Sequence, residues 1–168
     1  GVEMVRVGTA LEMRDAVLKA VADAHALIMA AAVGDYRPVS ESPQKIKKGS
    51  DTISLQLGLN PDILVEASGK VLRVGFAAES AGLLENARGK LQSKSLDLIV
   101  ANDVTADGSG FGSDDNKVTL VDSSGTEELP LMPKYDVAGR ILDRLTALLP
   151  TSKVRSRYHP TPVAKTLL

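Results

Sequence analysis

The spacing of hydrophobic residues changes along the first part of the chain. From Thr9 to Ala24 the apolar residues recur with the period of a half-buried helix, and Thr9 with Glu12 forms a capping box. Short apolar runs at Val5 to Val7 and at Ala26 to Val33 flank this segment, and the second suits a strand buried on both faces. The pattern therefore predicts a strand, a helix and a second strand in succession.

The same alternation continues along the chain. Helices are predicted over Asp62 to Ser68, Ser80 to Lys94 and Asp136 to Leu149, and strands over Val71 to Ala77 and Asp97 to Ala101. Thr52 to Leu57 alternates like an added strand, and Lys117 to Asp122 with Glu127 to Leu129 flank Ser-Ser-Gly as a hairpin. This order indicates an α/β fold of Rossmann-like type, an open and mostly parallel sheet flanked by helices with an added hairpin.

The length of the chain bounds the number of domains. Its 168 residues are the size of one ordinary domain, which we place at residues 1–150. The remaining tail, Thr151 to Leu168, mixes proline, serine and basic residues without periodicity. We expect this tail to be a poorly ordered extension.

Composition removes several function classes. The longest apolar run, Ala26 to Val33, is far shorter than the roughly 20 residues of a membrane span, and no leader opens the chain, so we expect a soluble, cytoplasmic protein. With no cysteine and two histidines, the sequence offers no disulfide, thiolate nucleophile or ordinary zinc site. A net charge of −1 gives no general attraction for nucleic acid, so an anion site would need a few local lysines.

Polar residues follow three of the predicted strands. Gly34 to Arg37 come after the run that ends at Val33, Glu79 comes shortly after Ala77, and Asn102 and Asp103 come after Ala101. Ligands of open parallel sheets bind beyond the carboxyl ends of the strands, so we expect these residues to share one rim. Each also has an ordinary explanation as loop or helix-cap chemistry.

Two groups of lysines are candidates for phosphate binding. Lys45 to Lys48 places three positive charges shortly after Asp35, which suits a magnesium-bound polyphosphate, although a solvated charge run is the usual explanation. Lys90 and Lys94 fall on the edge of the inward stripe of their helix, where two like charges repel unless an anion lies between them. Their stems could instead extend outward over apolar surface. Asn60-Pro61-Asp62 fits an N-cap at Asn60 followed by proline at the first helical position.

The segment Val104 to Asn116 contains Gly108, Gly110 and Gly112 around a single aromatic residue, Phe111. Connections of this length are usually functional or disordered, so we interpret it as a candidate lid. Its glycine spacing does not make it a dinucleotide fingerprint, because a strand-like segment follows rather than a helix.

These residues resemble the phosphopantothenoylcysteine synthetase family, usually the carboxy-terminal half of a bacterial fusion with phosphopantothenoylcysteine decarboxylase. The matching segments are AAVGDYRP from Ala31, KIKK from Lys45, NPDIL from Asn60, VGFAAES from Val74, the Lys90 and Lys94 pair, DLIVANDV from Asp97 and GFGSDDNKV from Gly110. They occur in order and span about Met4 to Leu149, so the resemblance covers most of the chain.

The resemblance implies roles for individual residues. Asp35 would hold a magnesium ion and, with Lys45, would be catalytic. The nucleotide would be bound by Ala30, Ala31, Asp35, Lys45, Pro61, Asp62, Ile63, Leu64, Phe76, Lys90 and Lys94. Within this set the segment Pro61 to Leu64 would read the cytosine. The acyl substrate would be bound by Ala31, Ala32, Asn102, Phe111 and Gly112, with Gly110 to Asn116 as a covering flap.

The implied reaction joins 4′-phosphopantothenate to L-cysteine in coenzyme A biosynthesis. CTP activates the carboxylate as an acyl-cytidylate, and the cysteine amine then displaces CMP. The resemblance also implies a homodimer, with FMN confined to a fused decarboxylase domain outside this chain. In the family a βα unit with a glycine-rich stretch and a catalytic asparagine precedes the equivalent of Gly1, so we expect the catalytic domain here to be incomplete.

The alternative functions are a nicotinamide dehydrogenase and a non-catalytic binding module. A short-chain-type nicotinamide dehydrogenase fits poorly, since no tyrosine has a lysine four residues later and no strand–GxGxxG–helix segment exists. A non-catalytic α/β module that binds a nucleotide or a partner stays open. The choice of CTP over ATP also stays open, because some relatives use ATP.

Overall fold

A five-stranded sheet forms the centre of the protein. The computed structural model describes residues 2–47, 49, 52–67, 69, 71–79, 82–103, 108, 112–149 and 164–167. The strands run in the order β2 (Ala26–Met29), β5 (Leu72–Glu79), β6 (Leu98–Asp103), β8 (Val118–Asp122) and β9 (Gly125–Glu128). The first three are parallel, β8 pairs antiparallel with β6, and β9 pairs antiparallel with β8. The predicted α/β fold with parallel core strands and an added hairpin is confirmed.

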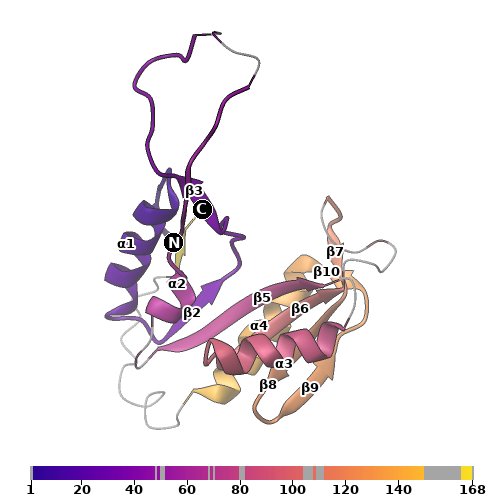
Figure 1. Cartoon of the computed structure of the whole chain (residues 1–168). Coiled ribbons are helices and arrows are strands. Elements are labelled where there is room, and N and C mark those ends of the chain that lie inside the picture. Colours follow the sequence, from indigo (N-terminus) through magenta and orange to yellow (C-terminus); the bar gives the residue numbers. More distant parts are fainter. Residues whose placement is uncertain are drawn as a thin grey trace.

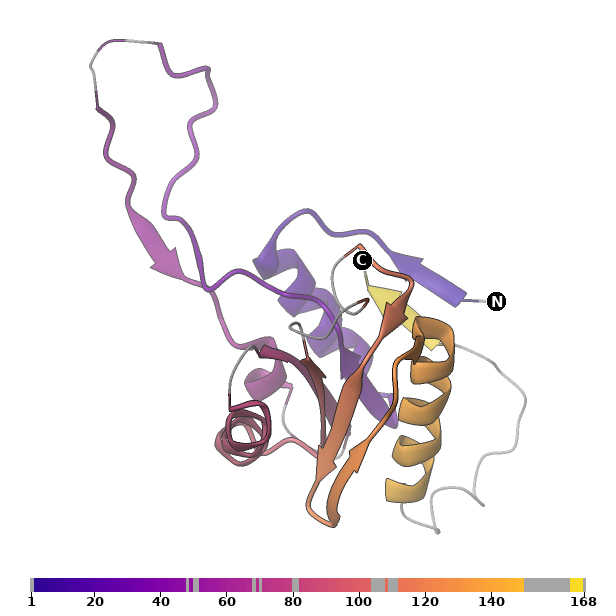
Figure 2. The same cartoon turned by 90° about the vertical axis from the view of Figure 1, so that its right-hand side faces the viewer.

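Helices cover both faces of this sheet. In Figure 2, α3 (Leu83–Ser93) and α4 (Lys134–Leu148) lie on opposite sides of it. The alternation of side chains along β6 explains how both can pack there: Leu98 and Val100 contact the α4 side, whereas Ile99 and Ala101 contact the α3 side. The strand is consequently apolar at successive positions, as expected of a strand buried on both faces.

A second group of elements packs beside β2 (Figure 1). Helix α1 (Ala10–Val21) begins at the predicted capping box, in which Thr9 accepts from the Glu12 amide and the Glu12 carboxylate accepts from the Thr9 amide. Its inward residues Met13 and Val17 meet the short helix α2 (Ile63–Glu66) through Ile63. This cluster places α2 at the carboxyl end of β2.

An extended arm projects from the body of the protein (Figures 1 and 2). It is the segment between β3 (Tyr36–Pro38) and β4 (Leu57–Leu59), which pair with each other antiparallel. The predicted strand over Thr52 to Leu57 is wrong except at its last residue. Ile53 and Leu55 are exposed and have no covering face, so pairing occurs only where β3 offers a partner.

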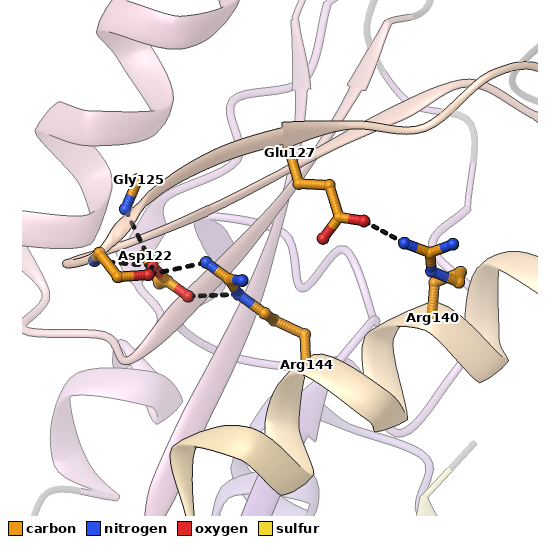
Figure 3. A network of polar contacts seen from close by, with 6 residues as sticks. Asp122, Gly125, Glu127, Arg140 and Arg144 are labelled. Carbon is orange, nitrogen blue, oxygen red and sulfur yellow. Dashed lines mark hydrogen bonds and ion pairs between the residues drawn. The ribbon is translucent and has the colours of Figure 1, made fainter.

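Polar contacts join the β8–β9 hairpin to α4 (Figure 3). The buried carboxylate of Asp122, at the end of β8, accepts from Arg144 Nε at 2.6 Å and from the Ser124 amide at 2.8 Å. Glu127 on β9 pairs with Arg140 one turn earlier on the helix. These ion pairs fix the turn of the hairpin against the helix.

Several element boundaries differ from those expected. The first strand, β1, is Val2–Val5 rather than Val5 to Val7, and β2 ends at Met29 because its pairing with β5 ends there. Helix α3 begins at Leu83, after Gly82 in the left-handed region at φ 62°. The short strands β7 (Asp115–Asn116) and β10 (Met132–Pro133) pair with each other.

Only residues 164–167 of the tail lie in the described part of the chain. Ala164–Leu167 forms strand β11, which pairs parallel to β1, while residues 151–163 lie outside the described part of the chain. Across the described residues, none of the helices is long and apolar enough to span a membrane.

Candidate functional site

A pocket of about 220 Å³ lies at the carboxyl ends of β2 and β5. Four segments line it: the end of β2 with the loop after it, the segment that enters α2, Phe76 of β5, and Lys94 at the end of α3. The lining residues are Met29, Ala31, Ala32, Val33, Gly34, Asp35, Asn60, Pro61, Asp62, Ile63, Leu64, Phe76 and Lys94. This is where ligands of open α/β sheets bind.

The loop after β2 is held by Asn60. The Asn60 side-chain amide donates to the carbonyl of Gly34 at 2.7 Å, and the Asn60 backbone amide donates to the carbonyl of Asp35 at 2.7 Å. Arg37 donates in turn to the Asn60 side-chain oxygen at 3.2 Å and to the carbonyl of Leu59. Asn60 therefore fixes two successive peptides of the pocket wall, and its predicted role as the N-cap of the following helix is wrong.

Asp62 is the residue that caps α2. Its Oδ1 accepts from the Val65 amide at 3.2 Å, and its Oδ2 lies 2.7 Å from Nζ of Lys94. One carboxylate thus both begins the helix and engages the lysine at the end of α3. The predicted mutual repulsion of Lys90 and Lys94 needs correction accordingly, because Lys94 already meets a negative charge within the protein.

The pocket brings together most of the residues that the sequence singled out. Its lining includes Ala31, Ala32, Asp35, Pro61, Asp62, Ile63, Leu64, Phe76 and Lys94. Four others are absent from its lining in the part of the chain described: Ala30, Lys90, Asn102 and Gly112. Lys45 belongs to the arm, which extends away from the sheet, and Phe111 lies outside the described residues, as does most of the candidate lid.

Sequence reasoning missed other contributors. Met29 and Val33 line the pocket because the chain leaves the sheet after Met29, four residues before the apolar run ends. Asn60 was assigned only to helix capping, since its contacts with Gly34 and Asp35 join positions more than 20 residues apart. Asn102 is held by Asn116, whose side-chain amide donates to it at 3.1 Å.

The pocket offers limited but suitable groups for a cation. No group of three acidic or histidine side chains that could enclose a metal exists among the described residues. Magnesium usually keeps several waters and binds one or two carboxylates together with the phosphates of its substrate. Asp35 in the lining is compatible with that mode, whereas Asp62 is engaged by Lys94.

Sequence comparison assigns the chain that forms this pocket to a known family. The profile described as the DNA/pantothenate metabolism flavoprotein (DFP) C-terminal domain matches residues 1–149. The chain belongs to this family. The DFP domain thus includes every element that lines the pocket.

Relatives of this DFP domain include larger proteins. A protein of Vibrio vulnificus named coenzyme A biosynthesis bifunctional protein CoaBC is 41% identical over 154 residues, covering 88% of this chain and 38% of the relative. Cysteine/cysteine sulfinic acid decarboxylase from an unknown prokaryotic organism is 36% identical over 154 residues, covering 88% and 43%. The chain therefore spans about two fifths of these relatives.

A solved structure supports the fold assignment. The crystal structure of the C-terminal domain of coenzyme A biosynthesis bifunctional protein CoaBC superimposes with a TM-score of 0.69 at 34% identity, over 86% of this chain and 65% of that one. The DFP domain therefore shares its Rossmann-like architecture with that domain.

Proposed function

We propose that this DFP domain acts in coenzyme A biosynthesis as a phosphopantothenate–cysteine ligase that uses CTP. One observation carries the proposal. A single pocket combines the Asp35 carboxylate, the Lys94 ammonium and the peptide wall from Pro61 to Leu64, in a chain related to CoaBC. A carboxylate suits a magnesium ion, a lysine suits a phosphate, and peptide groups suit the hydrogen-bonding edge of a base.

The proposed reaction has two displacements. A carboxylate oxygen of 4′-phosphopantothenate attacks the α-phosphorus of CTP, which breaks the bond to the β-phosphate oxygen and releases pyrophosphate. The amine of L-cysteine then attacks the activated carbonyl, CMP leaves, and the nitrogen loses a proton to give the amide. Neither step needs a protein nucleophile, so the chain contributes by positioning groups and stabilising charge.

The proposed roles combine the position of each residue with the role that the family resemblance implies for it. Asp35 would hold magnesium, which neutralises charge on the triphosphate when bound. Lys94 would contact a phosphate after leaving Asp62, and Lys90, one turn earlier on α3, would lie on the outer side of the same phosphates. Asn102 and the segment around Gly112 would face the acyl substrate across the carboxyl end of β6.

The arm supports the proposal of a homodimer. More than half of the surface is exposed for Val39, Ile46, Ile53 and Leu55 on the arm and for Leu57 and Leu59 on β4 next to it. Apolar side chains gathered on one projecting segment indicate an interface with another polypeptide. Lys45 lies on this arm, so we propose that it acts on phosphates in the assembled dimer. Sedimentation equilibrium measures the assembly: we expect a dimer, and a monomer at all concentrations would contradict this part of the proposal.

The bifunctional relatives support a fused architecture. Because the matched region is 38% of the Vibrio vulnificus protein, a decarboxylase joined to this domain is part of the proposal. FMN would then belong to that decarboxylase and not to the pocket described above.

Thermal melting with nucleotides tests the proposed specificity. Magnesium and CTP should raise the melting temperature of the full-length protein more than magnesium and ATP do, because a ligand stabilises in proportion to its affinity for the folded state. We expect the backbone groups of the segment from Pro61 to Leu64, which lines the pocket, to match the hydrogen-bonding edge of a pyrimidine better than that of a purine. Equal shifts with both nucleotides would remove the CTP assignment.

Asp35→Asn tests the cation role. This substitution keeps the shape of the side chain but removes its negative charge, so CTP affinity should lose most of its dependence on magnesium. Titration calorimetry with and without magnesium measures that dependence. Asp15→Asn, an exposed carboxylate on α1, is the matched control and should behave as the unmodified protein. Unchanged magnesium dependence in Asp35→Asn would show that another group holds the ion.

The alternative is a non-catalytic module that binds a nucleotide or a partner. The cysteine/cysteine sulfinic acid decarboxylase relative favours it, because a protein named for a different activity also carries a matching region. The two proposals differ in the fate of CTP. A ligase releases pyrophosphate only when phosphopantothenate is present, whereas a binding module leaves CTP intact.

A further inference from the structure

The short helix α2 has little stability of its own. It contains four residues, Ile63–Glu66, and isolated helices of that length do not form in water. It nevertheless supplies Ile63 and Leu64 to the pocket wall, and its N-cap Asp62 also lines the pocket. Its position must therefore be set by contacts with its surroundings.

Arg73, on β5, makes one of these contacts. The residue is buried, at 8% exposure, and its guanidinium donates from one nitrogen to the carbonyl of Leu64 at 2.9 Å. The backbone of β5 next to Arg73 is also closely packed against its neighbours. A Cβ placed on Gly75, two residues along the same face of the strand, would lie 3.3 Å from Leu64 Cδ1 and 2.8 Å from Leu96 Cδ1. The pocket wall is consequently seated directly on β5.

The other terminal nitrogen of Arg73 donates to the carbonyl of Ser95. Ser95 has a φ of 50°, the left-handed conformation that residues with a side chain rarely adopt. It ends α3 in a Schellman motif, with the Leu96 amide donating to the Leu91 carbonyl and the Ser95 amide to that of Gln92. The residue just before this turn is Lys94. Arg73 thus supports the turn that sets the direction of Lys94.

We propose that Arg73 is a positioning residue for the nucleotide pocket, holding α2 and the end of α3 at the separation that binds CTP. One guanidinium joins the two segments beneath the pocket, and the ion pair of Lys94 with Asp62 joins them at its surface. When a phosphate draws Lys94 away from Asp62, the contacts of Arg73 keep the two segments in register. The rigid planar fork of arginine suits two carbonyls at once, which lysine cannot match. This inference rests on the proposed function for the identity of the ligand.

The test compares three variants of the full-length protein. Arg73→Met removes both donors, Arg73→Lys retains the charge, and Arg144→Met is the control, an arginine that holds a carboxylate on the far side of the sheet. We expect Arg73→Met to weaken CTP at least roughly tenfold in calorimetry, with Arg73→Lys recovering part of the loss. The CTP-to-ATP affinity ratio should fall as well. Arg144→Met should lower the melting temperature yet leave CTP affinity unchanged.

Hydrogen exchange separates this inference from the proposed function. In Arg73→Met the amides of Ala67 and Leu96 should exchange roughly tenfold faster or more, and in Arg144→Met they should not. Unchanged exchange at both amides would overturn the positioning role whatever the nucleotide. Faster exchange in a protein that binds no CTP would leave that role intact and remove the ligand assignment. If Arg73→Met does not fold, Arg73→Lys decides. Wild-type CTP affinity together with wild-type exchange rates in Arg73→Lys would overturn the inference, whereas weaker CTP binding together with faster exchange would support it.

Discussion

Lys94→Ala is expected to weaken CTP binding by roughly 1.5 to 3 kcal/mol, the range for a charge-assisted hydrogen bond. The stability of the ligand-free protein should change by less than about 1 kcal/mol, because the pair that Lys94 makes with Asp62 is more than one third exposed on both sides. Titration calorimetry beside a thermal melt measures both quantities. Lys19→Ala, on the exposed surface of α1, is the matched control and should keep full CTP affinity.

Asp62→Asn is expected to change the affinity for CTP in the opposite direction. Asparagine keeps the cap of α2 but no longer holds Lys94 by charge, so CTP should bind more tightly than in the unmodified protein. If the ion pair between Lys94 and Asp62 were only structural, Lys94→Ala and Asp62→Asn would each lose a similar small amount of stability, and the affinity for CTP would not change in either variant. That pattern, or wild-type affinity in both Lys94→Ala and Lys90→Ala, would end the assignment of these lysines to phosphate.

Asp122→Ala should cost about 3 to 5 kcal/mol of unfolding free energy, the range for breaking a buried ion pair. The Asp122 side chain is 1% exposed and accepts from Arg144, from Ser124 and from the Gly125 amide (Figure 3). Its removal leaves the Arg144 guanidinium without that partner. Glu127→Ala, which breaks the more exposed pair with Arg140, should cost less than about 1 kcal/mol. Equal losses from the two variants in urea unfolding would contradict this account.

The same carboxyl makes stability depend on pH. Burial by itself would raise the pKa of Asp122, but the hydrogen bonds from Arg144 and Ser124 outweigh burial and lower that pKa below its ordinary value of 3.8. A carboxyl with a lowered pKa in the folded state contributes stability at pH values above 3.8 and loses it as the pH falls through the folded pKa. The difference in unfolding free energy between the unmodified protein and Asp122→Asn should therefore shrink below about pH 4.

The sequence predicted the parts of the fold that local patterns determine. Thr9 and Glu12 announce α1 because a capping box is completed within four residues. The run from Asp97 to Ala101 predicts a strand, and Ser-Ser-Gly predicts the hairpin, since each signal lies within the element that it specifies. Helix α4 is likewise found within two residues of its predicted start.

Features that depend on distant partners were beyond such patterns. The sequence alone indicates a helix cap at Asn60, because the contact of Asn60 with Gly34 forms only when the chain folds. The sequence likewise gives no indication that Asp62 pairs with Lys94. The arm shows the opposite case: Thr52 to Leu57 has the alternation of a strand, but among the described residues only Leu57 of this range pairs in a strand, with Pro38. Strand β11 depends on β1, at the opposite end of the chain.

The sequence predicted which residues belong to the candidate site better than it predicted how those residues are arranged. The carboxyl-end rule pointed to Gly34 and Asp35, which line the pocket, because the rule reflects the topology of parallel strands. It could not show that Lys45 projects on an arm. Nor could it reveal Arg73, whose position inside an apolar strand marks it as unusual but whose two carbonyl partners come from separate segments.

The central claim is that this domain activates phosphopantothenate with CTP. The most direct measurement follows CMP and amide product together when the full-length protein is given 4′-phosphopantothenate, L-cysteine, magnesium and either CTP or ATP. We predict one CMP for each phosphopantothenoylcysteine with CTP, little product with ATP, and loss of both products in Lys94→Ala at CTP concentrations that saturate only the unmodified protein. Amide formation that proceeds without CTP, or CTP that is bound and never cleaved, would contradict the claim.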